Sequence, residues 1–232
     1  MPETSKPTLV LLHGAYHGAW IWDGLRAELA KAAVTCDAPE LSYGNYVEGE
    51  ESFLELSSER IIIAHSLAGT LVPALFARPG SAPPLKAIFL AAYLPALGQS
   101  ASDLARLDKG AAIGRALRLD KETGTVSLDP KRAAEALYGS AADKPEAVRA
   151  LHRLRPQPLA SFERRCEWPV PSGQSYIVCA RDQAITPALQ RRMAADARCS
   201  PTVSLDSCHM PMISAPRALA RCILGLAPEL LG

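Results

Sequence analysis

The stretch RIIIAHSLAG, at Arg60–Gly69, indicates the fold of this chain. Its first half is apolar and β-branched, as expected of a strand that is buried on both faces. The chain is expected to turn sharply at Ser66, and a helix is predicted over Leu67–Ala77, before the break at Arg78–Gly80. A buried strand that leads directly into a helix is one unit of an alternating α/β chain.

Apolar strands and amphipathic helices alternate on both sides of that stretch. Further strands are predicted at Thr8–Leu12, Ala33–Cys36, Leu85–Ala91, Ser175–Cys179 and Thr202–Leu205. Further helices are predicted at Leu25–Ala32, Ser52–Ser58, Pro187–Ala197 and Pro216–Leu224. Alternation of this kind predicts an α/β fold with a mostly parallel central sheet of about six strands and helices on both faces.

The alternation is interrupted between about residues 95 and 171. This segment is rich in Ala, Arg and Asp, has the pattern of helix and loop, and contains no strand as apolar as those around it. Because it separates two strands of an alternating core, we predict that residues 95–171 form an inserted helical cap, called the cap below. Residues 1–94 and 172–232 are then the core, and no internal repeat is present.

Composition and charge exclude several classes of protein. The chain has 232 residues, 48% of them hydrophobic, and a formal net charge of +1, so it can bury a sizeable core but has no basic excess for nucleic acid. Its apolar runs are strand-sized and its start lacks a signal layout, so we expect no membrane partner and a cytoplasmic location. The six cysteines show no C-x-x-C or zinc-type spacing, so neither a disulfide nor a metal site is predicted. Nothing in the sequence indicates an oligomeric state.

Ser66 is the first candidate catalytic residue. A tight turn from strand to helix places a serine side chain above the carboxyl edge of the sheet, where parallel α/β sheets bind ligands. The nucleophile elbow of α/β-hydrolases, G-x-S-x-G, has glycine two places before and after the serine, whereas this chain has Ala64 and Ala68. The stretch therefore departs from the motif by one methyl group on each side. The alternative is that Ser66 is only the N-cap of the following helix.

A serine nucleophile needs a base and an acid that orients the base, and candidates for both follow later in the chain. Asp182 comes directly after the strand at Ser175–Cys179, and His209 comes just after the strand at Thr202–Leu205. Carboxyl ends of parallel strands meet at one edge, so both side chains are expected beside Ser66, in the order that α/β-hydrolases use. Singly, Asp182 could be a turn residue and His209 a surface histidine, but the three together favour a Ser–His–Asp triad.

Acyl chemistry also requires N–H donors for the developing oxyanion. The loop at His13–Ala15, after the first strand, is predicted to supply the backbone N–H of Ala15. The residue after the nucleophile, Leu67, is predicted to supply the second N–H, and its place at a helix start favours negative charge there.

Several longer stretches resemble a known family. LLHGAYHGAWIW at Leu11–Trp22, LAAYLP at Leu90–Pro95 and CARDQAITP at Cys179–Pro187 are similar to the plant methylesterase and hydroxynitrile lyase family of α/β-hydrolases. Bacterial members of that family include small carboxylesterases, among them pyrethroid-type ester hydrolases. The resemblance continues at Gln190–Ala194 and Ser207–Pro211, and it covers most of the core but not the cap.

The resemblance implies the triad Ser66, Asp182 and His209, the oxyanion donors Ala15 and Leu67, and no metal or organic cofactor. The lyases resembled here carry a threonine after the first histidine and a lysine after the catalytic histidine, and the lysine stabilises departing cyanide. This chain has Gly14 and Met210 in those places. We therefore expect hydrolysis of a small-molecule carboxylic ester through an acyl-enzyme. The alternatives are acyl transfer, cyclisation or lyase chemistry on a specialised metabolite, or ligand binding without catalysis.

The pocket around Ser66 is expected to be lined by Tyr16, His65, Tyr93, Leu94 and Met210. The cap shapes this pocket but carries no recognisable motif, so neither the acyl nor the alcohol group is predicted.

Other polar and aromatic residues receive structural interpretations. His17 is expected to belong to the turn after the first strand, because His209 already fills the base position. Trp20 and Trp22 are expected to pack in the core. The cap arginines Arg149, Arg153 and Arg155 are expected on solvated helix faces, an anionic-substrate clamp being the alternative. Asp206, shortly before His209, is expected to point away from the site.

Overall fold

The computed structural model describes residues 6–43, 59–77 and 83–231. Its central sheet has six strands in the order β2-β1-β3-β4-β8-β9, and each neighbouring pair is parallel. The strands are β1 (Thr8–Leu12), β2 (Cys36–Asp37), β3 (Arg60–His65), β4 (Lys86–Leu90), β8 (Ser175–Cys179) and β9 (Thr202–Leu205). The predicted parallel sheet of about six strands is confirmed.

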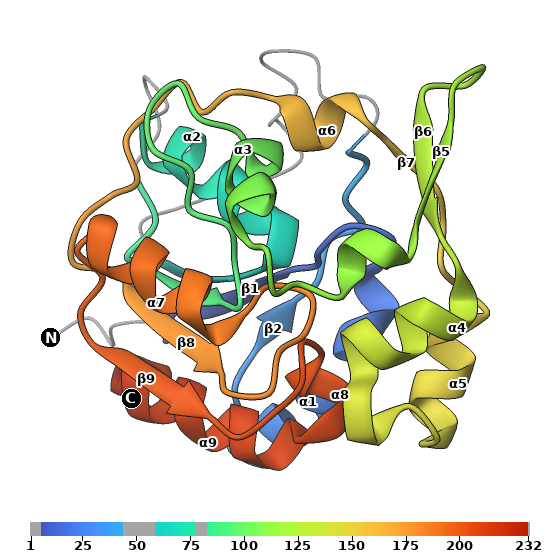
Figure 1. The fold of residues 1–232 in the computed structure, drawn as a ribbon. Helices are drawn as coiled ribbons and strands as arrows, with labels where there is room; N and C mark the ends of the chain where they lie inside the picture. Colours follow the sequence, from blue (N-terminus) through green and yellow to red (C-terminus); the bar gives the residue numbers. More distant parts are fainter. Residues whose placement is uncertain (1–5, 44–58, 78–82, 232) are drawn as a thin grey trace, which may run out of the picture.

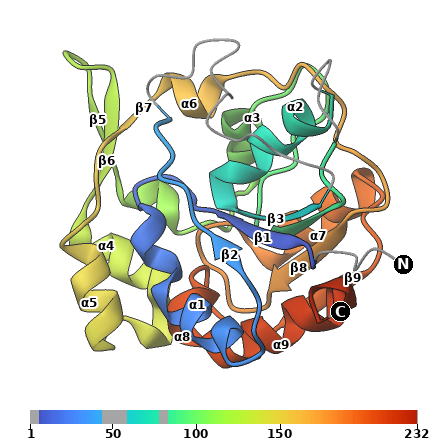
Figure 2. The ribbon, with the colours of Figure 1, turned by 180° about the vertical axis from the view of Figure 1, so that it is seen from behind.

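Helices cover both faces of this sheet (Figures 1 and 2). Helices α1 (Asp23–Ala30), α8 (Pro211–Ser214) and α9 (Pro216–Leu226) lie on one face, and α2 (Val72–Ala77) and α7 (Pro187–Asp196) lie on the other. Each is held by an apolar stripe at helical spacing, as in α9, where the buried residues are Leu219, Ala220, Ile223 and Leu226. No helix in the described ranges is long and apolar enough to cross a membrane.

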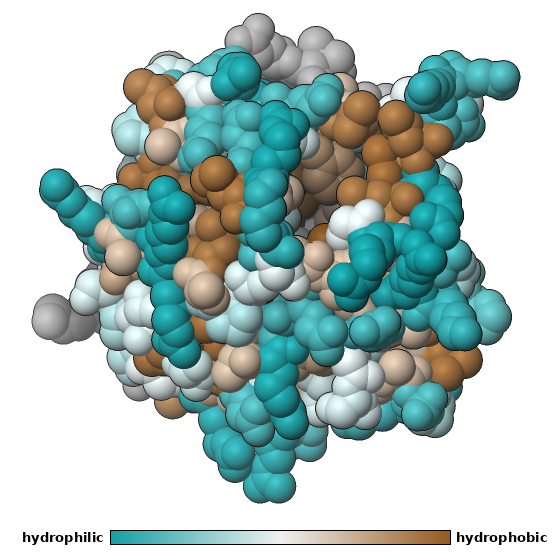
Figure 3. All heavy atoms as spheres, in the orientation of Figure 1, coloured by the Kyte–Doolittle hydropathy of each residue, from teal (hydrophilic) through white to brown (hydrophobic). Residues whose placement is uncertain are grey.

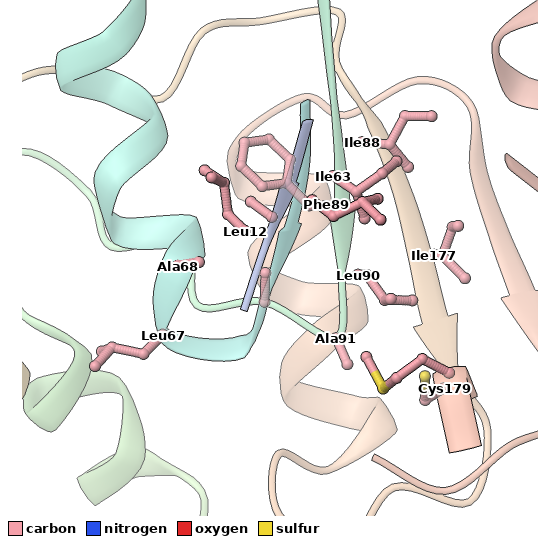
Figure 4. Close-up of a cluster of buried hydrophobic side chains, with 14 of the residues drawn as sticks. Leu12, Ile63, Leu67, Ala68, Ile88, Phe89, Leu90, Ala91, Ile177 and Cys179 are labelled. Carbon is pink, nitrogen blue, oxygen red and sulfur yellow. The ribbon is translucent and has the colours of Figure 1, made fainter. Parts of the chain in front are cut away.

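The core lies on both sides of β3. Its three successive isoleucines, Ile61–Ile63, are fully buried, and because neighbouring strand residues point to opposite faces, both faces must be covered. Figure 4 shows Ile63 of β3 beside Ile88 of β4, its partner in register, within the buried cluster. This double burial explains why the strand is an unbroken apolar run rather than an alternating one.

Two predicted starts of elements differ from the observed ones by more than two residues. Ala33 does not begin a strand, because it has a φ of 55° and closes the turn after α1, where its N–H donates to the carbonyl of Ala30. The helix predicted at Leu67–Ala77 starts as a 3-10 helix over Ser66–Leu71 and becomes α2 only at Val72. The helix predicted at Ser52–Ser58 lies outside the described residues.

The cap contains strands as well as helices, which corrects the expectation of mainly helix and loop. Its helices are α3 (Ala101–Leu107), α4 (Pro130–Ala133), α5 (Pro145–Leu151) and α6 (Ala160–Glu163). Its strands β5 (Leu117–Asp120), β6 (Thr125–Leu128) and β7 (Gln157–Pro158) form a small antiparallel sheet. The β5–β6 hairpin projects away from the core (Figure 1). Only two side chains of β6, Val126 and Leu128, are buried, which is too few to mark a strand in the sequence.

Candidate active site

Ser66 occupies the sharp turn between β3 and the 3-10 helix. Its φ of 55° lies in the left-handed region, which is strained for a residue with a side chain. Ala64 and Ala68 are both fully buried, and Ala64 lies in register between Leu12 and Phe89. The packing therefore accommodates one methyl group at each position where the G-x-S-x-G motif has glycine.

The loop after β1 approaches this turn at Gly14. A Cβ on Gly14 would lie 2.8 Å from the Cβ of Ser66 and 3.1 Å from Nδ1 of His65. Because carbon atoms cannot approach that closely without displacement, glycine is required for the two loops to meet. The loop that carries Ala15 thus lies against the serine, as the oxyanion prediction requires.

The side chains of Ser66, His209 and Asp182 form one chain of hydrogen bonds. Nε2 of His209 lies 3.1 Å from Oγ of Ser66, and Nδ1 lies 2.7 Å from Oδ2 of Asp182. A carboxylate only accepts, so Nδ1 carries the proton and Nε2 can accept the proton of the serine hydroxyl. The helix after the turn has His65 as N-cap, without a side-chain cap bond, so the alternative role of Ser66 as an N-cap is not what the structure shows.

Asp182 is held at both carboxylate oxygens. Oδ1 accepts from the backbone N–H groups of Ala184 and Ile185, at 2.7 and 3.0 Å, and Oδ2 accepts from Nε2 of Gln190 at 2.8 Å as well as from His209. The Gln190 amide is itself fixed, because its oxygen accepts from the N–H of Cys179 and its Nε2 also donates to the carbonyl of Ile185. Gln190, fully buried on α7, therefore orients the carboxylate of Asp182.

Replacing Gln190 by leucine is expected to lower kcat for an ester by about tenfold to a hundredfold, because a hydrogen bond to a charged group contributes about 1.5–3 kcal/mol. Gln190→Glu places a second buried carboxylate beside Asp182, and burial and the neighbouring charge raise its pKa. Its activity is therefore expected to fall further as pH rises and the second carboxyl ionises. Profiles of kcat/KM against pH measure this, with the exposed change Arg192→Gln on the same helix as control. A loss in Gln190→Glu that is constant with pH would contradict an orienting role.

His13 fixes the peptide that carries the N–H of Ala15, the first of the two predicted oxyanion donors. Its Nε2 accepts from the N–H of Leu41 at 2.9 Å, so Nδ1 carries the proton and donates to the carbonyl of Gly14 at 2.8 Å. Because the peptide is planar and trans, holding that carbonyl aims the N–H of Ala15 to the opposite side. Burial lowers the pKa of His13, which favours this neutral form. Leu67 lies in the first turn of the 3-10 helix, where N–H groups lack acceptors within the helix.

Two further buried histidines brace the site. Nε2 of His65 donates to the backbone carbonyl of His209 at 3.0 Å. His17 donates from Nδ1 to the carbonyl of Ala15 at 3.0 Å and accepts at Nε2 from the hydroxyl of Tyr138 at 2.8 Å. Burial lowers the pKa of His65 well below its usual value and that of His17 to about 3. Both nitrogens of His17 are in use, so it connects the cap to the oxyanion loop rather than transferring protons.

Arg155 makes a second connection between the cap and that loop. Its backbone N–H donates to the carbonyl of Tyr16 at 3.0 Å, and its guanidinium donates to the carbonyl of His17 at 2.6 Å and to the carboxylate of Glu40. Arg155 is exposed as expected, but it does not lie on a helix face, and its donors are engaged by the core. Arg149, in contrast, is exposed on α5 as expected.

A cavity opens from Ser66 between the core and the cap. On the core side its lining includes Ala15, Tyr16, His65, Leu67, Tyr93 and His209. On the cap side its lining includes Ile113, Leu117, Val126, Leu137, Leu159 and Phe162. Figure 3 shows apolar side chains gathered around a hollow on the face that carries the cap. Within residues 6–43, 59–77 and 83–231, no three His, Cys, Asp or Glu side chains are placed to hold a metal ion.

The structure places three of the five predicted lining residues in this cavity and corrects the other two. Leu94 is not among its described lining residues; it belongs to the buried core cluster, and its N–H donates to Sδ of Met193 at 3.5 Å. Met210 is also absent from that lining, because its side chain is fully buried at the start of α8.

Residues 9–222 match the alpha/beta hydrolase family. The chain belongs to this family. Methylesterase 9 of Arabidopsis thaliana is 25% identical to this alpha/beta hydrolase over 253 residues, which cover 95% of this chain and 98% of the relative. The expected resemblance to the plant methylesterases is thereby confirmed.

Solved structures of other alpha/beta hydrolases are similar over the whole chain. Polyneuridine aldehyde esterase has a TM-score of 0.77 at 19% identity, covering 96% of this chain and 100% of that one. A pyrethroid hydrolase from Sphingobium faniae has a TM-score of 0.71 at 20% identity, covering 96% of this chain and 97% of that one. At such identities the similarity establishes the fold of this alpha/beta hydrolase, which was predicted from its sequence.

Proposed function

We propose that this protein is a serine hydrolase that cleaves a carboxylic ester through an acyl-enzyme, with Ser66, His209 and Asp182 as catalytic triad. The observation that carries the proposal is their continuous hydrogen-bonded chain beside an apolar cavity. The name of the similar plant protein, a methylesterase, supports an ester as substrate. The close approach of Gly14 to Ser66 supports an oxyanion site in the loop after β1.

In the proposed reaction, Ser66 Oγ attacks the ester carbonyl while its proton passes to Nε2 of His209. Asp182 stabilises the imidazolium that forms, and the N–H groups of Ala15 and Leu67 donate to the oxyanion. Collapse of this intermediate breaks the bond to the alcohol, which leaves with the proton from His209. A water molecule, deprotonated by His209, then attacks the acyl-serine and releases the acid.

Two experiments test the proposal. The first is labelling with a fluorophosphonate, and the second is an assay of hydrolysis with p-nitrophenyl esters of increasing acyl length. We expect covalent modification of Ser66, located by mass spectrometry, and hydrolysis of at least one ester. A ligand-binding protein without an aligned triad would show neither result. Labelling accompanied by faster transfer of the acyl group to an added alcohol than to water would favour an acyltransferase instead.

Cyanide release from mandelonitrile is expected to be undetectable above buffer. Met210 stands where the resembled lyases carry a lysine, and its buried thioether offers no charge to a departing cyanide. The threonine of the lyases could not be accommodated at Gly14, since even a Cβ there would lie 2.8 Å from the Cβ of Ser66. A colorimetric cyanide assay measures this, and release that disappears in Ser66→Ala would overturn the choice of hydrolase.

A further inference from the structure

Two tyrosine hydroxyls in the cavity have no protein partner. Tyr16, in the loop after β1, and Tyr93, after β4, both line the cavity that contains Ser66. Their exposed fractions are only 6% and 8%, so bulk water contributes little at either side chain. Within the described part of the chain, neither hydroxyl takes part in a hydrogen bond. An unpaired hydroxyl in apolar surroundings is costly, so each is suited to a ligand that supplies the missing partner.

Both hydroxyls face space that a ligand can enter. In the described ranges, the polar side-chain atoms that are sealed from solvent without a partner are Trp22 Nε1, His65 Nδ1, Gln157 Oε1 and Ser175 Oγ. The two tyrosine hydroxyls are not among them, so they keep some accessible surface, and both residues line the cavity. Burial raises the pKa of both phenols, and the negative charges of Asp108 and Asp182 raise that of Tyr93 further. Both groups are therefore neutral O–H donors.

The backbone fixes both rings relative to the nucleophile. The N–H of Tyr93 donates to the carbonyl of Ser66 at 3.0 Å. Tyr16 has a φ of 67°, its carbonyl accepts from the N–H of Arg155, and its ring stacks on Phe162 with centroids 5.8 Å apart. Donors that are already oriented lose little freedom when a ligand binds, so they can discriminate between substrates.

The rest of the cavity selects for an uncharged ligand. No Asp, Glu, Lys or Arg is among the described lining residues, and the cap side is apolar except for Ser102. A carboxylate would enter without a charge partner, which is unfavourable in such surroundings. A carbonyl oxygen fits better, because it is neutral, accepts two hydrogen bonds and adds no donor of its own.

We propose that the hydroxyls of Tyr16 and Tyr93 bind a second, uncharged carbonyl oxygen of the substrate, so that esters bearing a ketone are preferred over plain esters of equal size. This inference rests on the proposed ester hydrolysis. It makes the two tyrosines specificity-determining residues, distinct from the groups that carry out the chemistry.

The test compares plain esters with isomers in which a ketone is moved along the acyl chain of methyl octanoate or the alkyl chain of octyl acetate. Each is measured with the wild type, Tyr16→Phe, Tyr93→Phe and the double variant. For the best-placed ketone, the ratio of kcat/KM for the keto ester to kcat/KM for the plain ester is expected to fall about fivefold to tenfold for each hydroxyl removed. The intrinsic reactivities of the two esters are the same in every variant, so they cancel when the ratio of keto to plain ester in a variant is compared with the ratio in the wild type.

Tyr176→Phe provides a matched control. The hydroxyl of Tyr176 donates to the carbonyl of Ala92 at 2.8 Å and lies outside the cavity lining. This variant is expected to lower the unfolding temperature but keep the ketone preference. Tyr16→Phe and Tyr93→Phe are expected not to lower the unfolding temperature, since their hydroxyls have no partner to lose, but to reduce the ketone preference.

Calorimetric binding of the same esters to Ser66→Ala separates this inference from the proposed function. If the wild type hydrolyses no ester, the proposed function fails, but tighter binding of a keto ester that is lost in the added Phe variants still supports the tyrosine site. Equal losses for keto and plain esters, or no ketone preference at any position in both rate and affinity, would overturn the inference.

Discussion

Ser66→Ala is expected to lower ester turnover by at least about 10⁴-fold, because it removes the proposed nucleophile while the rest of the site stays in place. Among the residues that the structure describes, the lost Oγ has one side-chain hydrogen bond, to Nε2 of His209, and alanine is no bulkier in the turn. Activity that persists would reflect only the oxyanion donors and substrate binding. The measurement is kcat for the best p-nitrophenyl ester, together with the unfolding temperature, which is expected to change little.

Ser204→Ala is a suitable comparison, because it makes the same substitution at an exposed serine of β9. It should retain the activity of the wild type. If Ser66→Ala keeps more than about a tenth of the wild-type turnover, Ser66 is not the nucleophile, since loss of a triad nucleophile costs far more than that.

Much of the fold could be predicted from local sequence signals. The bounds of β1, β8 and β9 agree with the prediction, because β1 and β8 are short, largely apolar runs closed by turn residues and β9 alternates polar with apolar residues. The sequence predicts a strand from Ala33 because nothing in it distinguishes an alanine with a left-handed φ from one with an extended φ. The sequence does not predict the small cap sheet because β5 is exposed along its whole length, including the large apolar side chains of Leu117 and Leu119. Such a strand is stabilised by its partner β6 and not by an apolar pattern.

The site residues that directly follow core strands could be predicted from their order along the chain. Ser66, Asp182 and His209 each follow a strong strand, and the parallel sheet brings those strand ends together. The orienting role of Gln190 could not be predicted from the sequence, because a glutamine in an amphipathic helix resembles a solvated residue. Only the folded structure shows that it is fully buried. The apolar cap lining was not predictable, because its residues come from separate segments that meet only in the folded protein. Tyr16 and Tyr93 were recognisable as lining, but not as unpaired donors.

Asp182→Asn is expected to lower turnover by about 10³- to 10⁴-fold. In the wild type, both carboxylate oxygens of Asp182 accept from donors. The NH₂ of an asparagine must therefore face donors in either orientation, the N–H groups of Ala184 and Ile185 in one, or His209 and Gln190 in the other. In the second arrangement Nδ1 of His209 becomes an acceptor, so Nε2 carries the proton and cannot accept the one from the serine. The mismatch also costs stability, on the order of 1–3 kcal/mol for an unpaired buried group. Rates must therefore be compared well below the unfolding temperature of the variant.

The matched control is Asp206→Asn, the other carboxylate near the base. Its side chain is 79% exposed and pairs with Nε of Arg181 at 2.9 Å, on the surface rather than in the site. An exposed pair of this kind contributes about 0–1 kcal/mol, so Asp206→Asn is expected to change both turnover and stability little. A large loss in Asp206→Asn with a small one in Asp182→Asn would move the acid to Asp206. That result would also mean that the 2.7 Å hydrogen bond between Asp182 and His209 has no part in catalysis.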